Sequence, residues 1–406
     1  MIKRINYNIL NKMNNKQAYV TKQANSLYDK VVGYRQHLHK HPELSYQEHN
    51  TMLFISEQLT KIGIPHETEV AETGIVAIIR GNQHAPEQPC IGLRADIDAL
   101  PILEKNNVPY ASINKGVMHA CGHDVHTSVL LGAAEILFNM KDELEHPVKL
   151  IFQPGEEKNP GGASLMIAAG CLQNPKVKEM YALHVFPDLP VGQVGTKAGL
   201  YMASCDEIYI DIIGKSGHGA TPHETIDSIL VGAEIITSLQ QIVSRKCDPK
   251  IPCVLNFGHF EGLGTTNVVP EKVHIKGTFR TMNEEWRAKA LEQIVKQAEL
   301  IAEAHGAQAK VEISKGYPFL ENDVDLTQNF VKKANDWLGK ENVHDLPIRL
   351  TAEDFSFYAQ EIPTCFFRIG VRNEANGIIH GVHNARFDID HEALKTGMQM
   401  MVMACL

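Results

Sequence analysis

The chain has 406 residues, of which 44% are hydrophobic and 21% charged, and its formal net charge is -9. This composition is typical of a globular protein and argues against disorder or a fibrous fold. The length favours two domains over one. There is no dense basic stripe of the kind that binds nucleic acid, and no stretch approaches the roughly 20 apolar residues of a membrane span.

The N-terminus carries basic residues but no apolar core of signal-peptide length. We therefore expect a cytoplasmic protein in which the first dozen residues form a polar extension and Met13 is an alternative start. Eight cysteines, at positions 90, 121, 171, 205, 247, 253, 365 and 405, show no paired or regular spacing. In a large cytoplasmic chain this pattern is typical of buried free thiols. Cys121 is the exception, because histidines surround it.

The first half of the chain predicts alternating helices and strands. Two amphipathic helices are expected first, one that ends before Pro42 and one that ends at Gly63. GIVAIIRG and CIGLRADID are predicted as strands of a covered sheet. A helix over residues 127–140, the strand VKLIFQ, the helix GGASLMIAAG and the strand MYALHV follow. This alternation predicts a mostly parallel sheet with helices on both faces.

The pattern changes near residue 200. EIYIDIIG is predicted as a strand, followed by a helix over 225–245, the strands CVLNFGHF and KVHIKGTFRT, a helix over 283–305 and the strand AKVEIS. The order β-α-β-β-α-β is that of the split ferredoxin-like unit. We predict that this α+β domain, residues 200–313, is inserted into an α/β catalytic domain.

The catalytic domain is therefore expected to consist of residues 14–199 and 314–406. Its second part is predicted to contain a helix over 326–338, the strand CFFRIG and a C-terminal helix over 391–404. The sequence shows no internal repeat and no low-complexity linker.

The strongest local signal is HACGHDVH, residues 119–126. Cys121 and His123 are two residues apart, and in an extended or turning segment they point to the same side, as two ligands of one ion must. The positive end of the helix that follows favours a thiolate over a thiol. The alternative is a polar turn that only caps this helix.

Three further segments contain carboxylates or histidines that could bind a metal or hold the attacking water. Glu156 and Glu157 follow the strand VKLIFQ at the carboxyl edge of the sheet, where open α/β sheets bind ligands. One can bind metal while the other holds the attacking water, although a loop Glu pair is more often solvated. His184 is expected to close an apolar strand, where a lone histidine is more often structural. His380 and His383 lie in a loop near the C-terminus.

Taken in order, these segments resemble a known family. The sequence is similar to the hippurate hydrolase, N-acyl-amino-acid amidohydrolase and auxin-conjugate hydrolase subgroup of the aminoacylase/carboxypeptidase metallopeptidases. The matching segments span nearly the whole chain after about residue 25: HLHKHPELSYQE, LRADIDALP, HACGHDVHTSVLLGAA, IFQPGEE, ALHVFPDLPVG, GKSGHGATPHETID, TNVVPEKVHIKGTFR, AEDFSFY and HNARFDID. This series is specific for the family but not for the substrate.

The resemblance implies a zinc-peptidase-like catalytic domain with two divalent metal ions per subunit, zinc or manganese. The ligands that it implies are Cys121, His123, Glu157, His184 and His383. It makes Glu156 the general base, which takes a proton from water and passes it to the leaving amine. Asp96 and Asp98 would contact the ligands rather than the metal. Arg94 stands where other branches of the family have a ligand histidine.

In the inserted domain, the resemblance points to three further residues. His218 would donate a hydrogen bond to the tetrahedral oxyanion, in its own subunit or in a neighbouring one. The alternative is that His218 and His223 only cap the helix at 225–245. Asn267 and Arg280 would bind the substrate carboxylate or carbonyl, for which arginine suits a bidentate clamp. The alternative for Arg280 is the solvated face of a strand.

Two features of the sequence depart from the family pattern or leave it open. His380 lies three residues before His383, and the spacing to the following phenylalanine favours His383 as the ligand. Thr351 stands where the family usually has glycine. The shape of the nearby pocket wall therefore does not follow from the resemblance. The inserted domain is expected to act as a lid and to form a homodimer, with a tetramer as the alternative.

The expected reaction is hydrolysis of an N-acyl or N-aroyl L-amino acid to a carboxylate and a free amino acid. Deacetylation of N-acetyl-diaminopimelate, or a metallo-dipeptidase or carboxypeptidase activity, would use the same site. A non-catalytic binding protein would be expected to have lost a ligand or the base. A metal store would have closed coordination without a catalytic carboxylate. A serine hydrolase is disfavoured, because the sequence has no G-x-S-x-G motif.

Overall fold

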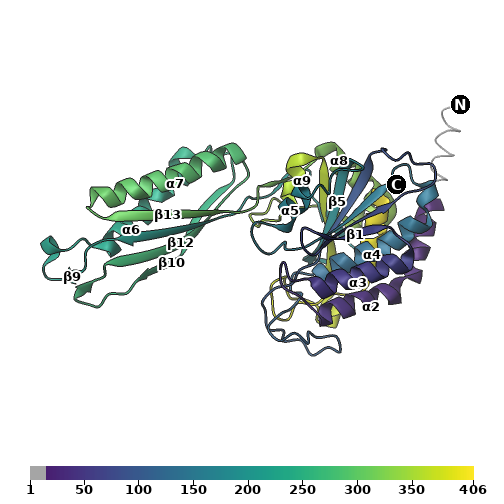
Figure 1. The fold of residues 1–406 in the computed structure, drawn as a ribbon, viewed down its shortest axis with the longest axis horizontal. Helices are drawn as coiled ribbons and strands as arrows, with labels where there is room; N and C mark the ends of the chain where they lie inside the picture. The colour runs from purple at the N-terminus through teal and green to yellow at the C-terminus, as the bar shows by residue number, and fades with distance from the viewer. Residues whose placement is uncertain (1–14) are drawn as a thin grey trace. The chain divides into compact units, whose positions relative to one another are not determined.

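A computed structural model describes residues 15–406, so the expected polar extension and the alternative start at Met13 lie outside the described residues. The chain divides into two compact units, whose elements are labelled in Figure 1. The first unit comprises the chain up to Gly199, Glu321–Pro347 and Phe357–Leu406, and the second comprises Leu200–Leu320 and Ile348–Ser356.

The units differ from the expected domain boundaries in two places. Residues 314–320 and 348–356 lie in the second unit, although the sequence analysis assigns 314–406 to the first domain. Hydrogen bonds explain the difference. The backbone N–H of Cys205 donates to the Tyr317 carbonyl at 3.1 Å, and that of Arg349 donates to the Tyr201 carbonyl at 2.8 Å. Contacts distant in sequence therefore draw both segments into the second unit.

An eight-stranded sheet in the order β1-β2-β4-β3-β5-β16-β6-β15 forms the centre of the first unit. Its strands are β1 (His66–Val70), β2 (Gly74–Ile79), β3 (Cys90–Asp96), β4 (Val148–Gln153), β5 (Val177–Pro190), β6 (Val194–Thr196), β15 (Val343–Asp345) and β16 (Thr364–Arg372). Neighbours β4, β3, β5 and β16 run parallel, and β3 and β4 are buried along their whole length. A strand covered on both faces needs a continuous apolar run rather than alternation. The predicted mostly parallel sheet is confirmed.

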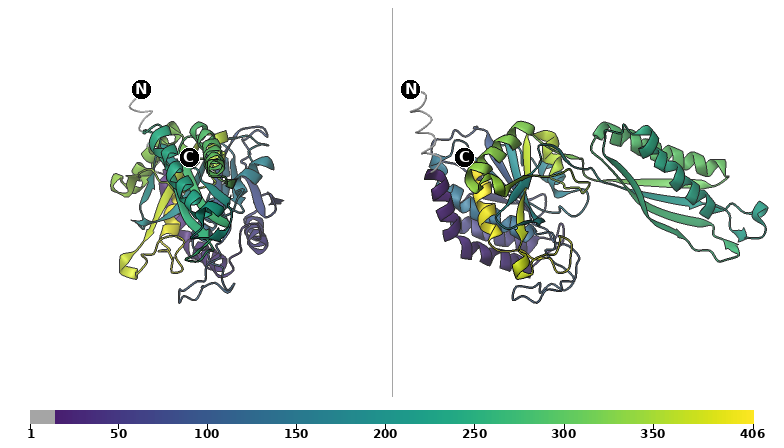
Figure 2. Two further views of the ribbon diagram at one scale, coloured as in Figure 1. Left: turned by 90° about the vertical axis from the view of Figure 1, so that its left-hand side faces the viewer. Right: turned by 180° about the vertical axis from the view of Figure 1, so that it is seen from behind.

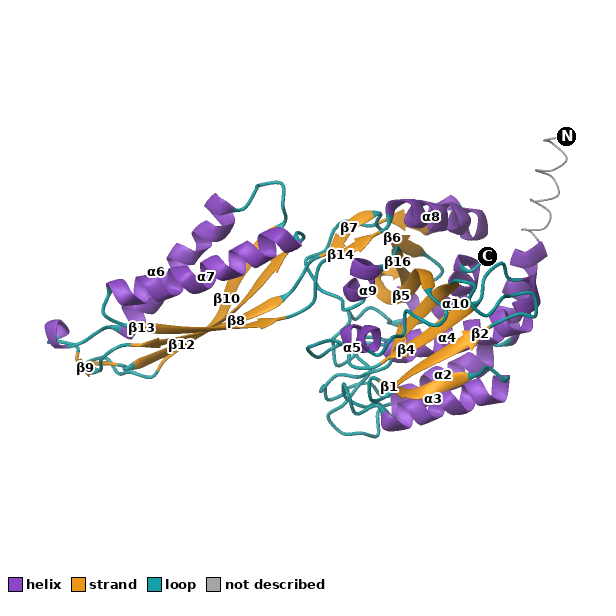
Figure 3. Ribbon diagram, turned by 45° about the horizontal axis from the view of Figure 1, so that its top comes forward, coloured by secondary structure: helices purple, strands orange, loops and turns teal. Residues whose placement is uncertain are grey.

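Helices cover this sheet. They are α2 (Tyr28–Lys40), α3 (His49–Ile62), α4 (His123–Asn139), α5 (Gly162–Ala168), α8 (Val324–Leu338), α9 (Ser356–Glu361) and α10 (Ala393–Ala404), with short 3₁₀ turns at Lys141–Glu143, Lys340–Asn342 and Glu374–Asn376. α4 is buried over most of its length, because α2 and α10 pack on it and it packs on β3 (Figure 3). α3 ends where Gly63 adopts a φ of 90°, which favours glycine.

The second unit has the predicted β-α-β-β-α-β order. Its elements are β8 (Asp206–Ile213), α6 (Ser228–Gln241), a π-helical turn (Ile242–Lys246), β10 (Cys253–Gly262), β12 (Lys272–Thr281), α7 (Glu284–Ala304) and β13 (Gln308–Lys315). The strands form an antiparallel sheet in the order β10-β12-β8-β13. Both helices pack on this sheet (Figure 2). The inserted ferredoxin-like domain is therefore confirmed.

Alternation along β8 explains why helices cover its sheet. Ile208, Ile210 and Ile212 are buried against residues of the two helices such as Ile235 and Ile294, while the side chains between the three are partly exposed. Smaller elements complete the fold: the pair β7 (Gly199–Met202) and β14 (Leu320–Asn322), the pair β9 (Gly217–His218) and β11 (Val268–Val269), and a 3₁₀ turn at Pro222–Glu224. Within residues 15–406, no helix is both long and apolar enough to span a membrane.

Candidate metal centre

Side chains that can bind a metal gather at the carboxyl edge of the central sheet. Asp96 ends β3 and pairs with Gln153, which ends β4, so the loops that follow both strands start at the same edge. His184 lies on the neighbouring β5. The expectation that His184 closes this strand is wrong, because β5 continues beside β16 as far as Pro190.

The donor atoms form overlapping clusters. Those of Cys121, His123 and His184 lie within 4.8 Å of one another, and Cys121 forms a second such cluster with Glu157 and His383. His123 also clusters with Glu156 and Glu157. The structure thus brings together the five expected ligands and the expected base. Among residues 15–406, His380 occurs in none of the clusters that could hold a metal.

Cys121 and His123 converge through a turn rather than along an extended segment. α4 begins at His123, four residues earlier than predicted, and Gly122 before it has a φ of 92°. A Cβ at Gly122 would lie 2.5 Å from Cγ2 of Val185, so this position excludes a larger residue. Of the two geometries that the sequence allows for this pair, extended or turning, the structure has the turn, and both side chains reach the same cluster.

Asp98 orients His123. Its Oδ1 lies 3.1 Å from Nδ1 of His123, and its Oδ2 accepts hydrogen bonds from Ser45 at 2.6 Å and from the backbone N–H of Glu157 at 3.0 Å. Nε2 of His123 is buried without a hydrogen-bond partner, although Asp96 Oδ2 lies 3.6 Å away. A nitrogen held in this way, with its partner nitrogen bonded to a carboxylate, is the arrangement of a metal-binding histidine.

The cluster is electrostatically unbalanced without a cation. Burial lowers the pKa of His123, but Asp96 and Asp98 outweigh burial and raise it to about 10. Burial, followed by Glu157 and Glu156, raises the pKa of the Cys121 thiol well above its usual range. A divalent ion among these groups would reverse both effects, because it favours the thiolate and the neutral imidazole. The donor set therefore fits a metal.

His184 is held for ligation in the same way as His123. Its Nδ1 donates to the Val185 carbonyl at 2.8 Å, and its Nε2 lies 3.4 Å from Sγ of Cys121. Burial, and then the positive charge of Arg368, lowers the pKa of His184 well below its usual value. The ring is therefore neutral, as a metal ligand must be.

His383 differs from the other expected ligands, because its side chain is 54% exposed. Its φ is 64°, a left-handed value that is uncommon for a residue other than glycine. The backbone N–H of His383 donates to the Ala120 carbonyl at 2.7 Å, and its Nε2 lies 3.2 Å from Oε1 of Glu157. The contact with the Glu157 carboxylate raises the pKa of His383.

His126, to which the sequence analysis assigns no role, supports two sides of the cluster. Its Nδ1 lies 2.5 Å from Oδ1 of Asp96, and its Nε2 accepts the backbone N–H of Val185 at 3.0 Å. Because Asp96 is also bonded to Arg94 at 2.7 Å, the ring is fixed between a charged pair and the strand that carries His184. His126 is the third histidine of HACGHDVH, and its place in this motif is the signal from which a role at the site could have been predicted.

A buried ionic network lies behind α4. Nε of Arg35 on α2 donates to Oδ2 of Asp124 at 3.0 Å, and Nδ1 of His39 lies 2.8 Å from the same oxygen. Arg35 also donates to Asp388 at 2.8 Å. Asp124 follows His123, so the network holds the first turn of α4 in place. Its partners lie 85 or more residues apart in the sequence, and no local pattern revealed them.

The three expected residues of the second unit fall in two places. His218 on β9 pairs with Val268 of β11, and the backbone N–H of Gly219 donates to the Asn267 carbonyl at 2.8 Å, so His218 and Asn267 are neighbours. Arg280 lies near the end of β12, is partly exposed, and donates to the Leu350 carbonyl at 3.2 Å.

The helix-capping alternative for His218 and His223 is wrong. The side chain of Asp227 caps α6, because it accepts hydrogen bonds from the backbone N–H groups of Ile229 and Leu230 at 3.0 and 3.1 Å. The two histidines precede this cap and are exposed. A different role for them therefore stays open.

Comparison with known proteins shows the family of the chain. The model of peptidase family M20/M25/M40 matches residues 92–406. The chain belongs to this family. It is 39% identical over 369 residues to the N-acetyl-L-cysteine deacetylase of Bacillus subtilis (91% of this chain, 86% of that protein). It is 43% identical over 290 residues to the N-acyl-L-amino acid amidohydrolase of Geobacillus stearothermophilus (71% and 76%).

A solved structure with the same fold is the YXEP protein of Bacillus subtilis, described as a dinuclear metal binding peptidase from the M20 family. Its TM-score is 0.77 at 33% identity, over 94% of this chain and 98% of that one. This family member and the clusters around Cys121 support the binding of divalent metals in this chain.

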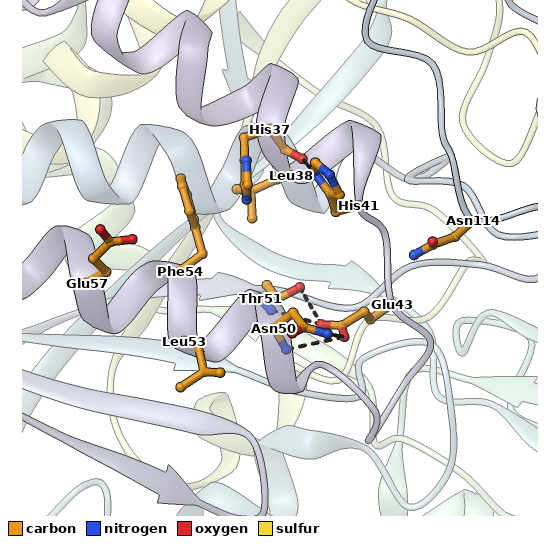
Figure 4. A pocket seen from close by; sticks show the side chains of 10 residues that line it. All are labelled: His37, Leu38, His41, Glu43, Asn50, Thr51, Leu53, Phe54, Glu57 and Asn114. Atoms are coloured by element: carbon orange, nitrogen blue, oxygen red, sulfur yellow. Dashed lines mark hydrogen bonds between the residues drawn. The ribbon is translucent and has the colours of Figure 1, made fainter.

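A separate pocket of about 430 Å³ lies between α2 and α3 (Figure 4). His37 stacks on Phe54 there, with ring centroids 4.2 Å apart, and Glu43 accepts hydrogen bonds from Asn50 and Thr51 at the start of α3. None of the expected metal ligands lines it. The Glu43 carboxylate is thus engaged by the first turn of α3, and we look for the chemistry in the clusters at the sheet edge.

Proposed function

We propose that this M20 hydrolase cleaves the amide bond of N-acyl L-amino acids, releasing a carboxylate and a free amino acid. The observation that carries the proposal is the convergence of Cys121, His123, Glu157, His184 and His383 beside the carboxylate of Glu156. The relatives that act on N-acyl amino acids by name support the substrate class. The acyl group and the amino acid are left to experiment.

In the proposed mechanism, Glu156 is the general base. It is buried in the loop after β4, and a hydrogen bond from the backbone N–H of Gly155 to Glu48 at 2.9 Å fixes that loop. A Cβ at Gly155, whose φ is 59°, would lie 2.3 Å from the Tyr46 ring. Glu156 takes a proton from the attacking water and returns it to the leaving amine.

Cys121, His123, Glu157, His184 and His383 are the proposed ligands of two divalent ions, with Cys121 common to two of the clusters. Two ions bound there would lower the pKa of a shared water and polarise the scissile carbonyl. Mixed thiolate, imidazole and carboxylate ligands suit zinc and also permit manganese. Asp96 and Asp98 orient the histidines.

His218 is the proposed hydrogen-bond donor to the oxyanion. The backbone N–H of Ala220 donates to Nδ1 of His218 at 3.0 Å, which leaves the ring proton on Nε2. The ring is exposed, so this N–H is available to a substrate. Asn267 and Arg280 are proposed to bind the substrate carboxylate or carbonyl through their side-chain N–H groups.

The first experiment measures amine release from acetyl, benzoyl, longer acyl and indole-acetyl amino acids and from acetyl-diaminopimelate. Each substrate is tested with added zinc or manganese and again with chelator. We expect hydrolysis of at least one N-acyl amino acid, lost with chelator and restored by metal. Hydrolysis of dipeptides alone would favour the metallo-dipeptidase alternative. A protein that binds no metal would contradict the proposed centre.

We also propose a cytoplasmic homodimer formed through the second unit, with a tetramer as a further possibility. β10 is an edge strand of its sheet, and exposed apolar side chains lie on or near it, including Phe260, Leu263 and Ile229. Such an edge offers both backbone and apolar surface to a second copy. Light scattering on the purified protein tests this, and a monomer at micromolar concentration would contradict it.

A further inference from the structure

Residues 101–114, which we call the strap, run as an irregular loop between β3 and α4 in the first unit. From Pro101 to Tyr110, its side chains alternate between exposed and partly exposed. A chain that lies extended along a surface has this pattern, because every second side chain turns toward the protein. The inward set includes Glu104, Asn106 and Tyr110. The proposed hydrolysis gives no task to any of the three.

The strap lies along the segment that carries His383. The backbone N–H of Lys105 donates to the Ala385 carbonyl at 2.8 Å, two residues beyond that proposed ligand. Nδ2 of Asn106 donates to the Phe387 carbonyl at 2.9 Å. The side chain of Phe387 is buried, whereas that of His383 is exposed. The strap therefore holds this segment where it passes from the surface into the core.

Tyr110 adds a third contact and joins the strap to the buried ionic network. Its hydroxyl donates to Oδ2 of Asp388 at 2.9 Å. The Arg35 guanidinium lies over its ring, 4.7 Å from the centroid, and donates to Oδ1 of the same Asp388 at 2.8 Å. The Asp388 carboxylate is therefore held by two donors, one on α2 and one on the strap.

Glu104 anchors the strap to α2 and orients Asn106. Its Oε1 lies 3.1 Å from Nε2 of His39 on α2, and the same oxygen accepts a hydrogen bond from Nδ2 of Asn106 at 3.1 Å. The backbone N–H of Ser112 donates to Oε2 of Glu104 at 2.6 Å, which ties the two ends of this stretch together. The amide group of Asn106 is thus fixed in the direction of the Phe387 carbonyl.

His383 is the proposed ligand that most needs such support. Its side chain is 54% exposed, and its φ of 64° is one that a residue other than glycine keeps only when its surroundings hold it. Its backbone N–H donates to the Ala120 carbonyl at 2.7 Å, which holds the residue from one side. The strap holds the chain that follows. A ligand that is already ordered binds an ion more tightly, because less conformational entropy is lost.

We propose that Asn106 and Tyr110 position His383 for ligation, and that the strap thereby sets the affinity for one of the two ions. The ion concerned is the one that Cys121, Glu157 and His383 would bind. This inference rests on the proposed metal centre. Both residues act through His383 and are therefore positioning residues. Loss of a group that orients a ligand typically weakens metal binding by about 10–100-fold.

The cluster of Cys121 with His123 and His184 provides an internal reference. His123 is fixed by Asp98, and His184 by the Val185 carbonyl, so their supports come from the sheet edge and not from the strap. A change in the strap should therefore weaken the binding of one ion and spare the other. General loosening of the fold would weaken the binding of both.

The test is equilibrium dialysis of the full chain against buffers of decreasing free zinc concentration, with metal content measured by elemental analysis. Asn106→Ala should weaken one of two ions by about 10–100-fold. Tyr110→Phe keeps the ring and should weaken the same ion less. Asn107→Ala is the matched control, because this neighbouring side chain is exposed, and it should bind both ions as the wild type does. Unchanged affinities in Asn106→Ala, or an equal loss for both ions, would overturn the proposal.

A double variant tests whether Asn106 acts through His383. His383→Ala should itself weaken one ion, and adding Asn106→Ala should then cause no further loss, whether the ions leave in one step or two. Additive losses would show that Asn106 supports the fold in general and would contradict the proposal. A wild-type chain that binds no zinc would contradict the proposed metal centre, so the two failures are distinguishable. None of these measurements depends on hydrolytic activity.

Discussion

Most of the candidate functional residues are buried in the first unit, where only His383 is largely exposed, and exposed or partly exposed in the second. In the first unit, His123, His184 and Glu156 are buried, and buried carboxylates fix the ring of His123. In the second unit, His218 and Asn267 are exposed and are held mainly through backbone contacts. The comparison indicates a division of work. The proposed metal ligands and base are mostly held in a buried environment, where electrostatic interactions are strong, whereas the residues proposed to contact the substrate are open to solvent.

The largest effect should come from the buried side of this comparison. Glu156→Gln removes the proposed base but keeps the size of the side chain, and we expect kcat to fall by about 10²–10⁴-fold. Metal content, measured by elemental analysis, should stay at the wild-type level. Glu157→Gln is the matched variant, because it alters a proposed ligand one residue away and should lose metal as well as activity. Near-normal kcat in Glu156→Gln would rule out its role as the base.

The expected ligands could be predicted because each lies in a short motif. A short motif can be recognised from neighbouring residues alone, without knowledge of contacts distant in the sequence. Of the side chains that support them, the resemblance pointed to Asp96 and Asp98, but the others could not be predicted. The contact of His126 with Val185 depends on how α4 lies against β5, and Asp124 meets Arg35 across 89 residues of chain. The early start of α4 depends on Gly122, whose left-handed φ has no signature beyond the residue type.

The same limit applies to the fold. Alternation and spacing predicted the two sheets, because burial of one or both faces leaves a pattern along each strand. The division of the chain into units depended instead on contacts such as that of Arg349 with Tyr201, which are distant in sequence. Pattern alone therefore placed the elements more accurately than the ends of the units.

The exposed side of the comparison predicts a smaller effect. His218→Ala removes the proposed oxyanion donor, and kcat should fall by about 10²–10³-fold, with KM and metal content close to wild type. His218→Gln should recover part of the loss, because its amide nitrogen can occupy the position of Nε2. His223→Ala removes an exposed histidine five residues away and should have little effect. A change confined to KM in His218→Ala would indicate substrate binding instead of stabilisation of the transition state.

The smallest predicted effect concerns stability in acid. Burial raises the pKa of Asp388, but Arg35, the backbone N–H of Ile389 and the Tyr110 hydroxyl outweigh it and lower that pKa. A carboxyl whose pKa is lower in the folded state contributes stability that is present above its unfolded pKa of about 3.9 and is lost as the pH falls. In the second unit, the lowered carboxyl pKa values belong to the partly exposed Asp211 and the exposed Glu285, where screening leaves little stabilisation.

Urea unfolding from about pH 6 down to about pH 3 separates the two units, because each contains one tryptophan. Trp286→Phe leaves Trp337 to report the first unit, and Trp337→Phe leaves Trp286 to report the second. On acidification, the first unit should lose on the order of 1–2 kcal/mol more unfolding free energy with Asp388 than with Asp388→Asn. The second unit should respond equally in both variants. Equal acid sensitivity of the first unit with and without this carboxyl would show that its contact with Arg35 does not stabilise the fold. The buried network would then serve to position α4 rather than to hold the unit together.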